Sequence, residues 1–152
     1  MSGSARAKSK TLTAWIAFLG GVLGLHRFYL RGWRDPIGWL HWPPALLGAW
    51  GLWRMDHYGQ DDRLAWLLIP LFGLALVAGA AAALHAGLMP DARWDARHRP
   101  DGPASTSGWP VVFAVIGALM VGATVLMATI AFSAQRFFEY QTEPVPQAQS
   151  AP

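Results

Sequence analysis

Residues 20–32 read GGVLGLHRFYLRG and place a polar quartet, His26 to Tyr29, within the first apolar stretch of the chain. Polar and charged side chains are costly in hydrocarbon, so such a run usually lies at a membrane boundary or serves a purpose there. The stretch therefore predicts an apolar helix that ends at a membrane surface and does not by itself indicate an activity.

Composition supports a membrane protein. Of the 152 residues, 53% are hydrophobic and 14% are charged, against roughly 25% charged in soluble domains. Most tryptophans lie near the ends of apolar runs, the level that amphipathic rings favour; these are Trp15, Trp33, Trp39, Trp53, Trp66 and Trp109. The net charge of +3 is spread along the chain without a basic patch interleaved with aromatics, which argues against a nucleic-acid partner. The chain has no cysteine, which excludes disulfides and thiolate metal sites.

Four apolar segments reach or approach the roughly 20 residues that cross a bilayer as a helix. They are Leu12–Leu30, Ile37–Met55, Leu64–Met89 and Trp109–Phe132. Short polar connections predict an all-α membrane protein with four transmembrane helices in two antiparallel hairpins, so that the N- and C-termini lie on the same side. Pro43 and Pro44 predict a kink or local unwinding in the second helix.

The segments imply four regions along the chain. A basic N-terminal segment (1–11) precedes a first helical hairpin (12–58), and a second hairpin (64–133) contains a polar loop (90–108) that holds at most a surface turn. The tail (141–152) has too little apolar surface to order and is expected to be disordered.

Targeting and orientation signals are weaker. No small-residue cleavage pattern follows the first apolar segment, which predicts a retained anchor rather than a cleaved signal peptide. With four spans, six Lys and Arg residues fall on each side of the membrane. The positive-inside rule therefore does not decide the orientation.

Small residues recur at helical spacing and predict close helix packing. Gly20 and Gly24 form a G-x-x-x-G pair in the first segment. Two longer rows follow, namely Ala75, Gly79, Ala83 and Gly87 in the third segment and Ala114, Ala118 and Gly122 in the fourth. The alternative is that glycine and alanine are simply common in transmembrane helices.

The first two segments resemble a TM2 domain, a two-helix membrane module, over residues 10–58. The resemblance rests on upstream glycines, the His-Arg-Phe-Tyr-Leu run and an aspartate that closes the second helix, here Gly20, Gly21, Gly24, His26, Arg27, Phe28, Tyr29, Leu30, Gly38 and Asp56. His26 is the form associated with bacterial members, so the resemblance implies a multi-pass protein of the cell inner membrane, with no established activity. Arg31 stands where the family has glycine, which implies a reshaped turn.

The polar quartet has two interpretations. Arg27 lies near a helix C-terminus, where a cation complements the macrodipole and its stem can snorkel to the headgroups, so anchoring alone explains it. Alternatively, Arg27, Arg31 and Arg34 form a recognition patch for an anionic lipid headgroup or a partner's carboxylate.

A second constellation comes from topology. In a four-span bundle His26, His41 and His85 fall at one membrane depth, where imidazoles from facing helices can ligate a metal or haem. The sequence has no H-x-x-x-H or C-x-x-C-H motif, which favours hydrogen-bonded boundary residues and no cofactor. A haem- or metal-binding electron-transfer subunit remains the alternative.

No catalytic constellation is recognisable, and the apolar segments lack the Asp, Glu or Lys residues that mark ion pathways. We therefore expect a non-enzymatic integral membrane protein with a structural or regulatory role. Its partners would be the lipid bilayer and either another membrane protein or a second copy of itself.

Overall fold

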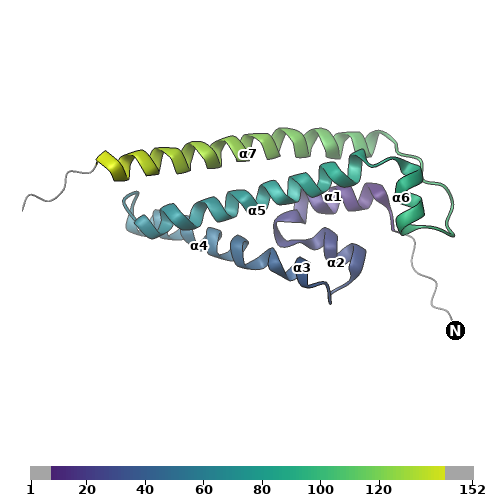
Figure 1. Cartoon of the computed structure of the whole chain (residues 1–152), viewed down its shortest axis with the longest axis horizontal. Coiled ribbons are helices and arrows are strands. Elements are labelled where there is room, and N and C mark those ends of the chain that lie inside the picture. Colours follow the sequence, from purple (N-terminus) through teal and green to yellow (C-terminus); the bar gives the residue numbers. More distant parts are fainter. Residues whose placement is uncertain (1–7, 143–152) are drawn as a thin grey trace, which may run out of the picture.

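The computed structural model describes residues 8–142, which form seven α-helices and one short 3-10 helix (Figure 1). In chain order these are α1 (Lys10–Gly20), η1 (Gly21–Leu23), α2 (Leu25–Arg31), α3 (Pro36–Leu40), α4 (Trp42–Tyr58), α5 (Arg63–Leu88), α6 (Asp91–His98) and α7 (Trp109–Thr142). Within the described residues, α5 and α7 are the two helices long and apolar enough to cross a membrane.

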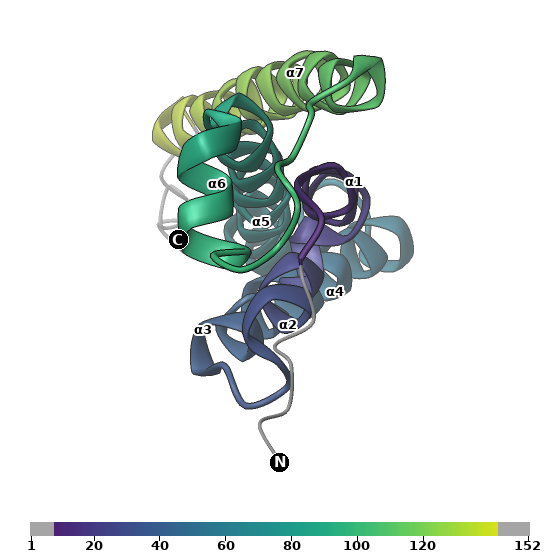
Figure 2. The same cartoon turned by 90° about the vertical axis from the view of Figure 1, so that its right-hand side faces the viewer.

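Helix α5 is the central element of the structure. The Asp62 side chain caps its N-terminus by accepting a hydrogen bond from the Leu64 backbone N–H at 3.1 Å, and Pro90 follows its end, where a proline cannot continue a helix. Seen from the α6 end, α5 lies between α7 on one side and α1 and α4 on the other (Figure 2).

The first apolar segment is not one helix from Leu12 to Leu30, so that prediction is wrong. Helix α1 ends at Gly20, and the chain reverses through η1 and Gly24, which has a φ of 68°. This left-handed conformation suits glycine because a Cβ would be strained there. Helix α2 then returns beside α1, and the Tyr29 hydroxyl accepts a hydrogen bond from the Ser9 backbone N–H at 3.1 Å.

The second apolar segment also divides. Asp35 caps α3 by accepting from the Ile37 N–H at 3.3 Å, and His41 separates α3 from α4. Pro43 and Pro44 lie in the first turn of α4, where the missing N–H groups have no intrahelical partner to lose. The predicted proline distortion therefore takes the form of a boundary between two helices.

Small residues bring α1, α5 and α7 together, as the rows in the third and fourth segments predicted. Two buried clusters join these helices. The alanines of the first are Ala14, Ala86 and Ala114, beside Met89 and Trp94, and the second consists of Ala17, Ala80, Ala83 and Ala118. A Cβ on Gly122 would come within 2.7 Å of the Ala80 Cβ. The Gly20 and Gly24 pair differs, because it lies at a helix end and in a turn rather than on a continuous helix face.

The reversal at Gly24 also changes the placement of the two ends of the chain. Helix α1 begins at Lys10, which bonds to Asp91 of α6, whereas α7 ends at Thr142, and that end of α7 lies at the opposite end of the molecule from α6 (Figure 1). Within the described residues, the expected arrangement of four spanning helices in two hairpins is therefore not confirmed. The loop at 90–108 contains α6 and not merely a turn, α7 extends into the expected tail, and residues 1–7 and 143–152 lie outside the described residues.

We expect Gly79→Ala to destabilise the fold. The new Cβ would lie 2.8 Å from the Gly21 carbonyl carbon, so α5 and the reversal would have to separate, at a cost of about 1–3 kcal/mol. Thermal unfolding in detergent measures the loss. Gly108→Ala is the control, because its Cβ would make only an ordinary contact of 3.5 Å with Pro110. Equal stability of the two variants would contradict the proposed role of the close approach.

Candidate functional site

A cavity of about 650 Å³ lies where α2 and α5 meet α6, with Thr13 of α1 on its wall. Its polar lining comes from residues far apart in the sequence: His26, Arg27, Arg31, His85, Arg97 and His98. No Asp or Glu is among the described residues that line it. We call this cavity the cationic pocket.

Arg27 is oriented by one carboxylate and leaves one donor unused. Its Nε donates to Asp35 Oδ2 at 2.7 Å, and this guanidinium holds the pKa of Asp35 below its usual range. Its Nη2 is buried and has no hydrogen-bond partner within residues 8–142. An unsatisfied buried donor costs about 1–3 kcal/mol, so this orientation of Arg27 is expensive unless another acceptor enters the pocket.

His26 presents a similar situation beside Arg27. The residue is 8% exposed, and its Nδ1 is buried without a partner in the described chain. Its ring lies edge-on to His41 with 5.9 Å between centroids, and His41 Nδ1 is hydrogen-bonded to the Ile37 carbonyl oxygen at 2.8 Å.

The three histidines of the metal hypothesis do not form one site. His26 and His85 both line the cationic pocket, whereas His41 lies outside its lining. Across residues 8–142, no group of three or more His, Cys, Asp or Glu residues could hold a metal ion. The geometry therefore gives the haem or metal alternative no support.

The aromatic residues of the quartet, Phe28 and Tyr29, contribute to packing within the fold. Phe28 is buried and stacks on Trp33 at a centroid distance of 5.0 Å, with Trp39 edge-on at 5.2 Å. Gly38 makes room for this ring, because a Cβ there would lie 2.5 Å from Phe28 Cε1. Phe28 therefore ties α2 to α3, as Tyr29 ties α2 to the start of α1.

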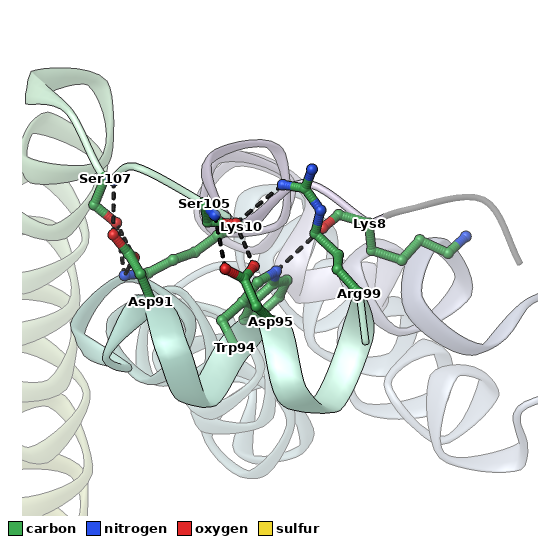
Figure 3. Close-up of polar contacts among 8 residues, drawn as sticks. All are labelled: Lys8, Lys10, Asp91, Trp94, Asp95, Arg99, Ser105 and Ser107. Carbon is green, nitrogen blue, oxygen red and sulfur yellow. Dashed lines mark hydrogen bonds and ion pairs between the residues drawn. The ribbon is translucent and has the colours of Figure 1, made fainter. Parts of the chain in front are cut away.

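Helix α6 closes the pocket at its outer end and is fastened to the N-terminal segment (Figure 3). Trp94 is 1% exposed, and its indole N–H donates to the Lys8 carbonyl oxygen at 3.1 Å. The Lys10 ammonium, 6% exposed, donates to Asp91 Oδ1 and to the Ser107 hydroxyl, each at 2.8 Å. Asp95 accepts hydrogen bonds from the backbone N–H and the hydroxyl of Ser105 at 2.7 and 2.5 Å.

The other residues proposed from the sequence lie away from the pocket. Arg34 is exposed in the turn before α3, outside the pocket lining. Asp56 lies near the C-terminal end of α4, which lies far from α2 (Figure 1), and its side chain is 85% exposed. Arg54 pairs with Asp62, its Nε lying 2.7 Å from Oδ2, and not with Asp56.

Sequence reasoning missed the α6 side of the pocket and the contacts that hold α6 in place. Arg97 and His98 belong to α6, which was not predicted, and nothing in their spacing pointed to Arg27. Asp35 carried a usable signal, because an aspartate directly before a proline is typical of a helix N-cap.

These features define a class: a helical membrane protein in which two short helices fold back against a long apolar one, leaving a cationic pocket between them. The family model of the TM2 domain matches residues 6–55. This match confirms the resemblance: the chain carries a TM2 domain. The domain includes α1, α2, α3 and most of α4. No curated protein and no solved structure matches the chain. The TM2 domain supplies Thr13, His26, Arg27, Leu30 and Arg31 to the pocket, and the helices beyond it supply the rest.

We expect Asp91→Asn to loosen α6 at neutral pH. The Lys10 ammonium, aided by Ser107, lowers the pKa of Asp91 from 3.8 to about 2. The ionised carboxylate is therefore stabilising above pH 4, and that stabilisation is lost as the pH falls through 2. The variant should lose about 1–3 kcal/mol at pH 7, the usual worth of a hydrogen bond to a charged group.

Thermal unfolding of both proteins in detergent from pH 7 down to pH 2 measures this difference. The gap between wild type and variant should stay constant to about pH 4 and then shrink. Asp101→Asn, on the exposed loop after α6, is the control for losing a carboxylate at this end. A gap that persists unchanged at pH 2 would contradict the assignment.

Proposed function

We propose that this chain is a non-enzymatic, multi-pass protein of the cell inner membrane with a structural or regulatory role. It would act by presenting the cationic pocket at one membrane surface and by packing against a partner membrane protein or a second copy of itself. The observation that carries the proposal is the reversal at Gly24, which folds the TM2 segment against α5 and forms the pocket at one end.

The lengths of the elements support a specific topology. Helix α5 has 26 residues and spans about 39 Å, which exceeds the roughly 30 Å of hydrocarbon. Gly21, at the reversal, contacts Gly79 in the interior of α5. We infer that α1, η1 and α2 enter the bilayer only part of the way and return, while α5, α7 and the α3–α4 pair cross it.

In this proposed topology, the positive charge is no longer balanced between the two sides of the membrane. With Lys8 and Lys10 bonded to α6, eight of the eleven Lys and Arg residues in the described chain lie at the α6 end. These are Lys8, Lys10, Arg27, Arg31, Arg34, Arg93, Arg97 and Arg99, against Arg54, Arg63 and Arg136 at the other end. The positive-inside rule then favours a cytoplasmic α6 end.

The pocket's chemistry favours binding over catalysis. Among its described lining residues there is no carboxylate, and its one hydroxyl, on Thr13, donates to the Ser9 carbonyl oxygen at 2.8 Å. A hydroxyl used in this way is not placed as a nucleophile. The large apolar side chains exposed along α7, such as Leu119, Met120 and Met127, suit contact with lipid or with a helix of a partner.

Single-cysteine labelling tests the topology, since the chain has no cysteine of its own. We expect Thr11→Cys and Thr106→Cys to react with an impermeant maleimide from the cytoplasmic side, and Gln60→Cys and Gln141→Cys from the opposite side. These neutral positions leave the Lys and Arg distribution unchanged. Four full spans would instead group position 11 with positions 60 and 141, and that result would overturn the proposal.

Purification in mild detergent tests the role and the cofactor alternative together. We expect a stable partner or a self-associated species in native electrophoresis, and a purified protein without a Soret band or bound metal by elemental analysis. A Soret band at stoichiometric intensity would replace this proposal with the electron-transfer alternative. A protein that is monomeric and alone after cross-linking in membranes would contradict the packing role.

A further inference from the structure

We propose that the cationic pocket binds the phosphate group of an anionic membrane lipid, which enters beside α5. The inference rests on the proposed function, because the pocket must lie at the level of the headgroups. Four features of the pocket support it: its charge, its unused donors, its apolar floor and its size.

The positive charge of the pocket favours the binding of an anion. Arg27 and Arg31 project from α2 and Arg97 from α6, and all three line the same cavity. Asp35 is the one carboxylate with an ion pair to these arginines in the described chain; it bonds Arg27 from outside the lining and also acts electrostatically on Arg31. A planar guanidinium offers paired donors that match the oxygens of a phosphate.

Unused donors show where the anion would bind. Arg27 Nη2 is buried and lacks a hydrogen-bond partner within the described chain, and so does Nδ1 of the buried His26. Both atoms are enclosed, so a phosphate oxygen can accept from Arg27 Nη2, or from His26 Nδ1 in the tautomer that carries a proton there, only after the neighbouring side chains shift. Anchoring by snorkelling would instead place the guanidinium in water, whereas Nη2 is enclosed.

The remaining walls favour a lipid over a free anion. Ala82 and Ala86 of α5 and Met89, which follows it, form an apolar floor beside the cationic groups, while Ala81 and His85 are exposed on the same stretch of α5. A chain attached to the phosphate could therefore leave along α5 into the bilayer. The volume of about 650 Å³ is that of a pocket for a sizeable ligand, well beyond the needs of one phosphate.

Binding can be measured on the full chain in phosphatidylcholine nanodiscs, with dioctanoyl phosphatidic acid, dioctanoyl phosphatidylcholine and inorganic phosphate as probes. We expect saturable binding of phosphatidic acid alone. Arg97→Ala should weaken it about tenfold or more, which is the usual effect of losing a hydrogen bond to a charged group. Arg93→Ala is the matched control, because Arg93 lies one turn away on the same helix and outside the pocket lining, and it should change the affinity less than twofold.

Arg27→Lys separates recognition from anchoring. Lysine keeps the charge and can snorkel but lacks the guanidinium fork, so the protein should insert at wild-type abundance and bind phosphatidic acid several-fold more weakly. If this variant fails to fold, Arg97→Ala still decides the question, because Arg97 is exposed. Wild-type affinity in both variants would overturn the proposal.

The remaining outcomes are equally decisive. Equal affinity for phosphatidylcholine, or equal losses in Arg93→Ala and Arg97→Ala, would reduce the effect to general lipid or surface charge and overturn it. Inorganic phosphate binding as tightly as phosphatidic acid would overturn the lipid assignment and identify a soluble phosphate as the ligand. A protein with the expected cysteine labelling that binds none of the probes would overturn this inference and leave the proposed topology standing.

Discussion

The contact between Gly21 and Gly79 is the constraint on which the rest of the structure depends. The two backbones approach so closely that a side chain on either residue would collide with the other. This contact holds the reversal of the first apolar segment against α5, with Gly24 supplying the left-handed turn. Because α2 then runs back beside α1, Arg27 and His26 come to face α5 and α6, and the pocket exists only as a result of that reversal.

Much of the fold could be predicted from periodicity and composition. The third and fourth apolar segments correspond to α5 and α7, and the small-residue rows mark faces that pack, because both features are local properties of the sequence. The reversal could not be predicted in this way, since Gly20, Gly21 and Gly24 are equally compatible with a glycine-rich helix. The left-handed turn at Gly24 and the close approach of Gly21 to Gly79 are set by tertiary packing, which local sequence does not display.

The candidate site was predictable in part for the same reason. Arg27 and Arg31 were singled out because they are charged residues next to an apolar run, a feature that can be read directly from one sequence. Arg97 could not be linked to them, because it lies in a short polar helix whose position depends on Trp94 and on Lys10 bonding across the fold. The even count of positive charges depends on the same point, since placing Lys8 and Lys10 opposite α6 assumes a first helix that crosses the membrane.

The fastening of α6 has a consequence for biogenesis. Lys10 and Asp91 are separated by 81 positions. Lys10, whose ammonium becomes nearly enclosed in the fold, is therefore synthesised long before Asp91 leaves the ribosome. The TM2 segment would thus enter the bilayer with Lys10 still hydrated and its part of the pocket not yet covered by α6. Only when α5 has inserted and α6 has emerged can the early and late parts of the chain close on each other, which makes completion of the pocket a late event in assembly.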